Sequence, residues 1–234
     1  MQMSDQTFQS QTIKIGLIGG LAFRAGIFYY EQILKNTKEN EKSLRLVFNH
    51  AEVNTVLAHI ASGNTQEIGK YLGGLANELF DAGAVNVSVT AIAPHIAIKE
   101  IKEVAKGQIV SALDTVASTI KSQGIQKVAV FGTKAVMTTD IYGAVPESIV
   151  VQLSPDEQEK VHNMYMDIAL HGKQGTIPEM EYFNYLADDI KNRHGVDAIV
   201  LAGTDLSSFY AEQQPEYPHL NMARLHIKQI LSHH

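Results

Sequence analysis

From Ile13 onward the chain alternates short apolar runs with longer amphipathic stretches, and this alternation constrains its fold more than any other feature. Such a pattern is typical of parallel strands joined by crossover helices. Strands are predicted at residues 13–18, 44–49, 86–91, 127–132, 148–152 and 197–202. Helices are predicted at residues 24–37, 65–81, 112–122, 156–170, 178–193 and 222–232, with a shorter helical piece after Pro94. We therefore expect an α/β fold with mainly parallel sheets flanked by helices.

An internal repeat predicts that this fold has two similar lobes. The strand and turn at residues 14–20 resemble those at residues 127–133. A second matched pair, residues 83–91 and 195–203, follows at almost the same interval in each half. Any two βα units share part of this pattern, so chance similarity is the alternative reading. The near-equal spacing of two matched pairs favours two pseudo-two-fold-related lobes.

The repeat also predicts the domain boundaries and the position of a ligand site. Residues 12–106 and 208–234 are assigned to the first lobe and residues 107–207 to the second, after a disordered leader at residues 1–11. In such sheets ligands bind beyond the carboxyl ends of the strands. A cleft between the lobes is therefore expected where four turns converge, at residues 19–26, 91–96, 132–139 and 203–208. Helix starts in these turns favour a small anion such as a carboxylate.

Composition excludes several classes of protein. The 19 Lys and Arg residues against 25 Asp and Glu residues give a net charge of −6, and no basic run appears, which argues against a nucleic-acid or membrane-surface partner. No apolar run approaches the roughly 20 residues of a membrane helix, and residues 1–11 lack a signal-peptide layout, so a cytoplasmic location is expected. The absence of Cys excludes disulfides, thiolate metal sites and a thiol nucleophile.

No metal or cofactor is expected from the motifs. The His residues show no H-x-H or H-x-x-x-H spacing, and the glycines at 16, 19 and 20 do not form the G-x-G-x-x-G nucleotide fingerprint. His233 and His234 are interpreted as a tag remnant or a frayed tail.

Two motifs in the first two-thirds of the chain resemble the aspartate/glutamate racemase superfamily. Residues 15–21 are similar to the family's opening I-G-x-x-G-G-M. Residues 131–134, followed by Met137 and Tyr142, resemble its L-G-T-x-x-T-M…F-Y stretch. Each motif alone is weak, and the identification depends on their order and spacing.

Three later motifs continue the resemblance, which extends over about residues 13–230. Residues 155–162 with Gly172-Lys173 resemble P-D-x-x-E-Q-x-x-V-H…G-K, and residues 201–206 stand where the family has L-G-C-T-E-L. Asn221 and His226 match a closing D-x-x-x-x-H, with Asn for Asp. The chain is thus identified as a member of this superfamily.

The resemblance fails at the two residues that carry the family's chemistry. The racemases use two thiols on opposite faces of the substrate α-carbon, at a C-N-T-x-H motif and at G-C-T-E. Here the first motif reads Ala91-Ile92-Ala93-Pro94-His95, and Gly203 stands in the second. Ala and Gly have no titratable atom, so a two-thiol racemisation cannot run in this chain.

The remaining residues of the expected cleft define two candidate catalytic groups. His95 is either an acid/base imidazole or a structural histidine bonded to backbone. Asp205 is either a helix N-cap or the family's acidic residue, which contacts the substrate amine or supports the base. The expected substrate-binding residues, from the turns and from the resemblance, are Arg24, Asn49, Ala93, Thr133 and Thr204.

Three functions follow from these expectations. The first is a cofactor-independent enzyme that binds an amino acid or related carboxylate and performs non-standard proton transfer, elimination or decarboxylation with His95 and Asp205. The second is a binding protein or pseudoenzyme that keeps the cleft without catalysis. The third is a dimer partner of an active paralogue. Retention of Thr133, Thr204, Asp205 and His95 favours a working cleft, and loss of both thiols favours a non-catalytic one. A homodimer is expected.

Overall fold

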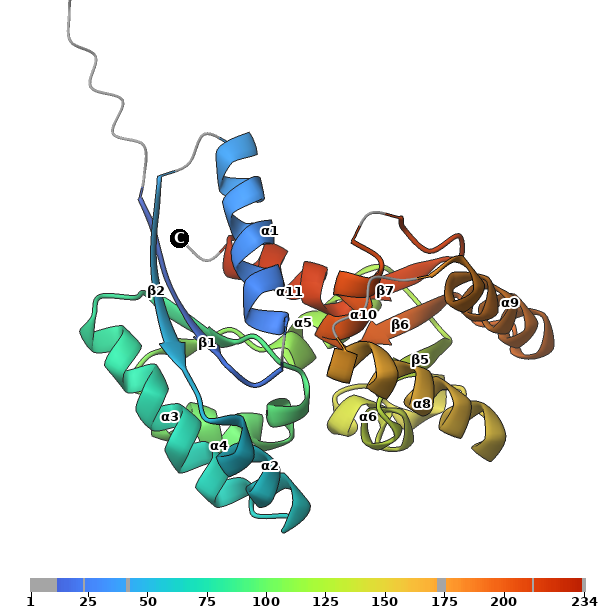
Figure 1. The fold of residues 1–234 in the computed structure, drawn as a ribbon, viewed down its shortest axis with the longest axis horizontal. Helices are drawn as coiled ribbons and strands as arrows, with labels where there is room; N and C mark the ends of the chain where they lie inside the picture. Colours follow the sequence, from blue (N-terminus) through green and yellow to red (C-terminus); the bar gives the residue numbers. More distant parts are fainter. Residues whose placement is uncertain (1–11, 23, 41–42, 172–175, 212, 233–234) are drawn as a thin grey trace, which may run out of the picture.

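The computed structural model describes residues 12–22, 24–40, 43–171, 176–211 and 213–232, and these form two α/β lobes that lie side by side (Figure 1). The predicted leader at residues 1–11, Gly172-Lys173 and His233-His234 lie outside the described residues. Each lobe is built on its own parallel sheet, flanked by helices. The predicted fold class, two lobes with parallel sheets flanked by helices, is confirmed.

The first lobe contains a four-stranded parallel sheet in the order β2-β1-β3-β4. Its strands are β1 (Ile13–Gly19), β2 (Leu44–His50), β3 (Asn86–Val89) and β4 (Gln108–Ile109). Its helices are α1 (Ala25–Glu39), α2 (Val53–Ala61), α3 (Thr65–Asp81), the 3-10 helix η1 (Ala93–Ala97) and α4 (Ile98–Val104). On β1, Ile15 and Leu17 pack with Phe28 of α1, whereas Ile18 packs with Leu72 of α3, because successive strand residues point to opposite faces.

The second lobe contains a parallel sheet in the order β5-β6-β7. Its strands are β5 (Val128–Gly132), β6 (Ala198–Ala202) and β7 (His219–Asn221). The helices of this half of the chain are α5 (Ala112–Ser122), α6 (Lys134–Thr138), α7 (Asp140–Gly143), the 3-10 helix η2 (Glu147–Ile149), α8 (Pro155–His171), α9 (Ile177–His194), α10 (Thr204–Phe209) and α11 (Met222–Ile230). β5 and β6 are buried along their whole length, which explains their continuous apolar sequences.

The prediction of a strand at residues 148–152 is wrong, but the position of this segment shows how the strand orders of the two lobes correspond. Residues 147–149 form the 3-10 helix η2, and only Val150 makes a single parallel bridge, to Val128 of β5. That bridge lies on the side of β5 away from β6, where β2 lies beside β1 in the first lobe. Both lobes therefore share one strand order, with this segment as a reduced counterpart of β2.

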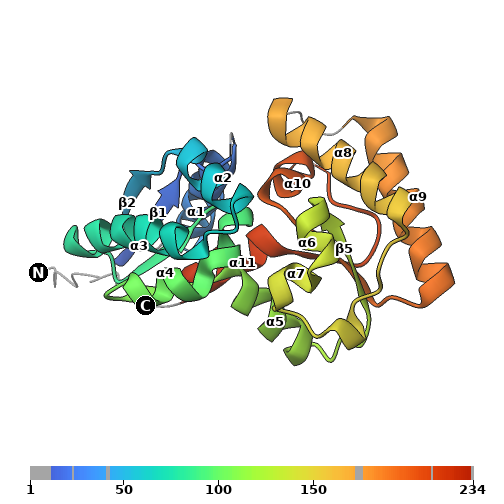
Figure 2. The ribbon, with the colours of Figure 1, turned by 90° about the horizontal axis from the view of Figure 1, so that it is seen from below.

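The last helix of each half contacts the core of the other half. α5 follows β4 of the first sheet, yet its Leu113 and Val116 belong to the second-lobe core. α11 follows β7 of the second sheet, yet its Ile227 and Ile230 pack with Ile15 and Phe28 of the first lobe. α5 and α11 also contact each other, and both views place them where the two lobes adjoin (Figures 1 and 2).

These exchanged helices move the expected domain boundaries. α11, within residues 208–234, packs with first-lobe residues. However, β4 pairs with the first sheet although residues 107–207 were assigned to the second lobe. β7 likewise pairs with the second sheet although residues 208–234 were assigned to the first. Among the described residues, no helix is long and apolar enough to cross a membrane.

Candidate functional site

The carboxyl ends of the two sheets approach each other at Thr90 and Thr204. The Thr204 hydroxyl, at the start of α10, donates a hydrogen bond of 3.0 Å to the carbonyl oxygen of Thr90, just past β3. Both residues are buried. Standard chain dimensions then place the Cα atoms of the adjacent Ala91 and Gly203 no more than about 12 Å apart. The two positions that the sequence pairs across the cleft are therefore close in space.

The first strand of the first lobe ends in a turn that tolerates no side chain. Gly20 has a φ of +83°, and a Cβ atom there would lie 2.4 Å from the carbonyl oxygen of Ala51. Arg24 follows, half-buried, at the N-cap of α1. On the neighbouring strand the half-buried Asn49 donates from its amide to Glu78 Oε2 of α3 at 2.7 Å. The Asn49 amide is thus engaged within its own lobe.

His95 lies in η1, the 3-10 helix that begins at the half-buried Ala93, and its ring is hydrogen-bonded to backbone on both sides. The Ala112 N–H donates to Nε2 at 3.2 Å, so Nδ1 carries the proton and donates to the Ala91 carbonyl at 2.9 Å. Burial lowers the pKa of His95 to about 4, so the imidazole is neutral near pH 7. This arrangement favours a positioning role that fixes the Ala91 turn, and the catalytic role of His95 stays a prediction.

A second buried histidine continues this network into the last helix. The ring of His226 on α11 lies 5.8 Å from the ring of His95, centroid to centroid. Its Nε2 donates to the Val110 carbonyl at 2.9 Å, and its Nδ1 accepts from the Tyr29 hydroxyl at 2.8 Å. Burial, followed by the neighbouring His95, lowers the pKa of His226 to about 3. Two neutral histidines therefore join η1, α1, α11 and the start of α5.

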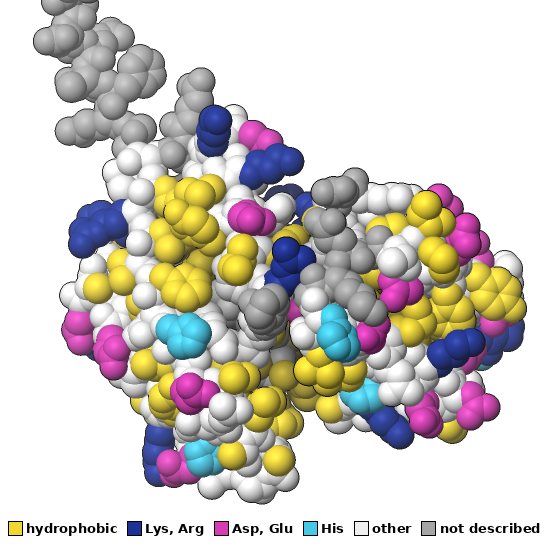
Figure 3. All heavy atoms as spheres, in the orientation of Figure 1, with side chains coloured by type: hydrophobic (Ala, Val, Ile, Leu, Met, Phe, Trp, Pro, Cys, Tyr) yellow, Lys and Arg dark blue, Asp and Glu magenta, His cyan; other side chains and the backbone are white. Residues whose placement is uncertain are grey.

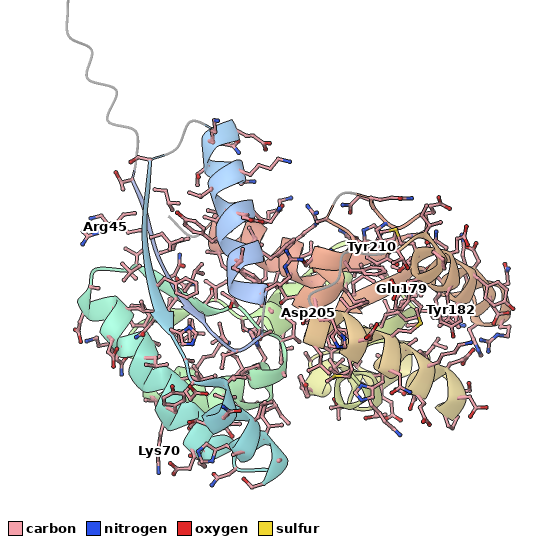
Figure 4. All side chains as sticks on the ribbon, in the orientation of Figure 1. Arg45, Lys70, Glu179, Tyr182, Asp205 and Tyr210 are labelled. Atoms are coloured by element: carbon pink, nitrogen blue, oxygen red, sulfur yellow. The ribbon has the colours of Figure 1, made fainter. Side chains whose placement is uncertain are left out.

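Asp205 supplies the acidic group on the second-lobe side. It lies in the first turn of α10, a helix that contacts α1 of the first lobe, and Figure 4 labels it where the two lobes meet. Its Oδ2 accepts a hydrogen bond of 2.9 Å from the Tyr165 hydroxyl of α8. Burial raises the pKa of Asp205, and the Tyr165 hydrogen bond opposes that rise. Asp205 and Tyr165 are both buried, with 5% and 8% of their surfaces exposed.

Thr133 brings the end of β5 to the same edge. It is the N-cap of α6, and its hydroxyl accepts from the Val136 N–H at 3.4 Å. Burial raises the pKa of the Tyr142 phenol, and a hydrogen bond with the Thr133 side chain opposes the shift. Burial raises the pKa of the Tyr165 phenol, and Asp205 and then Tyr142 add to that rise. Thr133, Tyr142, Tyr165 and Asp205 therefore form one polar cluster at the carboxyl edge of the second sheet.

The structure thus brings several predicted residues together and adds two that the sequence analysis did not select. Thr204 and Ala91 lie at the contact between lobes, His95 lies behind Ala91, and Asp205 and Thr133 lie on the second-lobe edge. Tyr165 and Tyr29 are the additions, and both occupy apolar-looking helix faces, so their sequence spacing resembles ordinary core packing. Within the part of the chain that the structure describes, no cluster of three or more His, Asp or Glu side chains could hold a metal ion.

Comparison with known proteins identifies the class to which this fold and site belong. The model of the Asp/Glu/Hydantoin racemase family matches residues 18–230, and the chain therefore belongs to that family.

Solved structures show the same two-lobed fold. An aspartate racemase homologue from Pyrococcus horikoshii OT3 has a TM-score of 0.78 at 22% identity, over 94% of this chain and 97% of that one. A candidate Asp/Glu racemase from Yersinia pestis has a TM-score of 0.81 at 22% identity, over 93% and 97%. An aspartate racemase from Picrophilus torridus has a TM-score of 0.69 at 20% identity, over 94% and 93%.

Proposed function

We propose that this protein binds a small amino acid or related carboxylate between its lobes, and that any chemistry there proceeds without thiols and without a cofactor. The observation that supports this most directly is the contact of Thr204 with the Thr90 carbonyl, which joins the carboxyl ends of the two sheets. In parallel α/β sheets this edge is where ligands bind. Arg24 at the start of α1 adds a cation able to pair with a carboxylate.

The acid/base group that we assign to this site is Asp205, because its raised pKa and burial suit proton transfer better than a solvated carboxylate. His95 is the second candidate, and it would have to break a backbone hydrogen bond before exchanging a proton with a ligand. Asp205 and His95 together could act in proton transfer, elimination or decarboxylation. The chain contains no Cys, so each of these reactions would have to use oxygen or nitrogen bases.

Binding is tested with a thermal-shift screen of amino acids, dicarboxylates, 2-oxo acids and hydroxy acids. A ligand present at a hundredfold excess over its Kd stabilises the protein by about 2.7 kcal/mol, which gives a clear rise in Tm. Asp205→Asn is expected to reduce the shift, and Asp188→Asn, an exposed carboxylate on α9, serves as the matched control. If no compound shifts Tm at millimolar concentration, the binding proposal is wrong.

Catalysis is tested by α-proton exchange. Aspartate or glutamate incubated with the protein in deuterium oxide should show no incorporation at ordinary racemase rates, because general-base help is worth about 10²–10⁴-fold and both thiol bases are absent. Rapid incorporation would show that another pair, with Asp205 as its first candidate, performs racemisation. Binding without exchange would instead favour a pseudoenzyme, or a dimer partner of an active paralogue.

A homodimer is also proposed, and an exposed apolar face supports it. Ile27, Tyr30 and Leu34 on α1, together with Phe48 on β2, form this α1/β2 face, and each is at least 40% exposed (Figure 3). A shallow apolar hollow of about 290 Å³ lies within it, lined by Gly26, Ile27, Tyr30, Leu46 and Phe48. Contiguous apolar surface of this kind marks protein interaction sites.

A further inference from the structure

In the part of the chain that the structure describes, two short segments pass between the sheets. Residues 110–112 lead from β4 of the first sheet into α5, which packs in the second-lobe core. Residues 221–222 lead from β7 of the second sheet into α11, which packs in the first-lobe core. Lobes joined in this way move relative to each other unless the contacts between them prevent it. The contacts that hold these two crossovers therefore help to determine how the lobes are oriented.

Two histidine rings hold the first crossover at its two ends. The Val110 carbonyl accepts a hydrogen bond of 2.9 Å from Nε2 of His226 on α11, and a longer one of 3.3 Å from the Ser88 hydroxyl. The Ala112 N–H donates to Nε2 of His95 in η1 at 3.2 Å. The two rings lie edge to face, with their centroids 5.8 Å apart. His226 therefore connects the first crossover to the helix that follows the second one.

The other nitrogen of each ring is fixed by the first lobe. Nδ1 of His95 donates to the Ala91 carbonyl at 2.9 Å, and Nδ1 of His226 accepts from the Tyr29 hydroxyl at 2.8 Å. All four ring nitrogens thus have partners, and the two neutral rings carry their protons on opposite nitrogens. Each ring therefore has a single orientation that satisfies both of its hydrogen bonds.

The burial of these rings favours a role in orientation over a role in packing. His95 and His226 have 1% and 0% of their surfaces exposed. Burying a polar ring costs free energy that its hydrogen bonds must offset, whereas an apolar side chain fills the same space without that cost. Packing alone therefore does not require histidine at either position. A buried polar network whose members all have partners restricts the surrounding elements to one arrangement.

From this geometry we propose that His95 and His226 clamp the crossover at residues 110–112 and thereby hold the two lobes in one relative orientation. Both are positioning residues in this role. Because His95 also donates to the Ala91 carbonyl, the clamp connects the lobe orientation to the turn that follows β3. The inference requires no ligand, so its test is independent of the proposed binding function.

The orientation of the lobes is measured by pulsed electron paramagnetic resonance between two spin labels. The chain has no Cys, so introduced cysteines are its sole labelling sites. Gln66→Cys on α3 and Glu181→Cys on α9 place one label on an exposed position of each lobe, and they should give one narrow distance distribution. Gln66→Cys with Lys38→Cys on α1 places both labels on the first lobe and is the control.

Glutamine and phenylalanine variants separate hydrogen bonding from packing. His226→Gln keeps an amide N–H that can donate to the Val110 carbonyl, and His95→Gln keeps an oxygen that can accept from the Ala112 N–H. His226→Phe and His95→Phe keep a ring and lose these hydrogen bonds. The interlobe distribution should broaden by roughly twofold in the phenylalanine variants and stay near the wild-type width in the glutamine variants. The distribution within the first lobe should not change.

A milder pair of variants tests the same clamp in case the phenylalanine variants do not fold. Tyr29→Phe removes a single oxygen atom and leaves Nδ1 of His226 without its donor, so the interlobe distribution should broaden. Tyr30→Phe, at the adjacent exposed position on α1, is the matched control and should leave the distribution unchanged. An unchanged distribution in Tyr29→Phe, or equal broadening in the glutamine and phenylalanine variants, would overturn the proposal.

Discussion

His95 and His226 are buried histidines whose ionisation is coupled to folding in the acidic range. Both rings are buried, and each accepts one hydrogen bond at a ring nitrogen that must be unprotonated: His95 from the Ala112 N–H, and His226 from the Tyr29 hydroxyl. The pKa of His95 is lowered to about 4 and that of His226 to about 3, against an ordinary value near 6.5. Below about pH 6.5 the unfolded chain therefore binds protons that the folded chain does not bind.

The free energy of unfolding is expected to fall as the pH drops from about 6.5 toward 4, and to be insensitive to these two groups above pH 6.5. The slope reaches at most about 2.7 kcal/mol per pH unit, since each histidine contributes up to about 1.4 kcal/mol. Urea unfolding at several pH values measures it. A free energy of unfolding that stays constant from pH 6.5 to 4.5 would contradict the lowered pKa values of His95 and His226.

At the scale of single elements, two adjacent glycines of α3 have opposite surroundings. A Cβ on Gly73 would lie 2.6 Å from Val104 Cβ, where α4 packs against α3. A Cβ on Gly74 would meet nothing within 4 Å. The close approach of α4 therefore depends on Gly73, and Gly74 contributes only backbone freedom to the unfolded chain.

Gly73→Ala should destabilise the protein by about 1–3 kcal/mol through overpacking, and Gly74→Ala should stabilise it by about 0.5–1 kcal/mol through helix propensity. Each variant is the control for the other, because the chemical change is the same and the positions are adjacent. Chemical denaturation measures both. The same sign for the two variants would show that the packing of α3 against α4 is not as described.

The sequence predicts those helices and strands whose positions are determined by their own local residue pattern. Helices α3 and α5 begin and end at the predicted residues, since Asn64 and Ser111 cap them with side-chain hydrogen bonds. The turn at residues 140–143 was not predicted: Asp140, Ile141 and Tyr142 all have positive φ values, between 50° and 57°. Such residues rarely adopt this conformation, and tertiary contacts such as the complete burial of Ile141 hold it.

In the candidate site, too, local sequence pattern predicts some features, whereas others depend on tertiary contacts. The turns that carry Thr133, Thr204 and Asp205 follow from the strand pattern, and the contact between lobes at Thr204 follows from the repeat. The contact between the Tyr165 ring and Gly203 joins two segments far apart in sequence. This contact depends on how α8 packs against the second sheet. The hydrogen bonds of His95 to Ala91 and Ala112 likewise depend on the path of β4 into α5. Neither could be predicted from one sequence.

For the whole molecule, the proposed dimer makes a measurable prediction about the α1/β2 face. Ile27→Asp should shift the solution mass from that of two chains to that of one, because a charge would replace a side chain that is 56% exposed in the single chain and covered in the dimer. Size-exclusion chromatography with light scattering measures this. Leu170→Asp, at an exposed apolar position on α8, should leave the mass unchanged. A wild-type mass of one chain would contradict the dimer.

The exchange of α5 and α11 has a consequence for the order in which the molecule can be made. Ile15 and Phe28 lie in β1 and α1, whereas α11, which packs against them, follows all the other elements that the structure describes. This part of the first-lobe core therefore stays incomplete until α11 has been translated, unlike the core of a domain that folds while the next domain is still being translated. A chain that ended after β7 would leave the side of Ile15 and Phe28 that α11 contacts exposed.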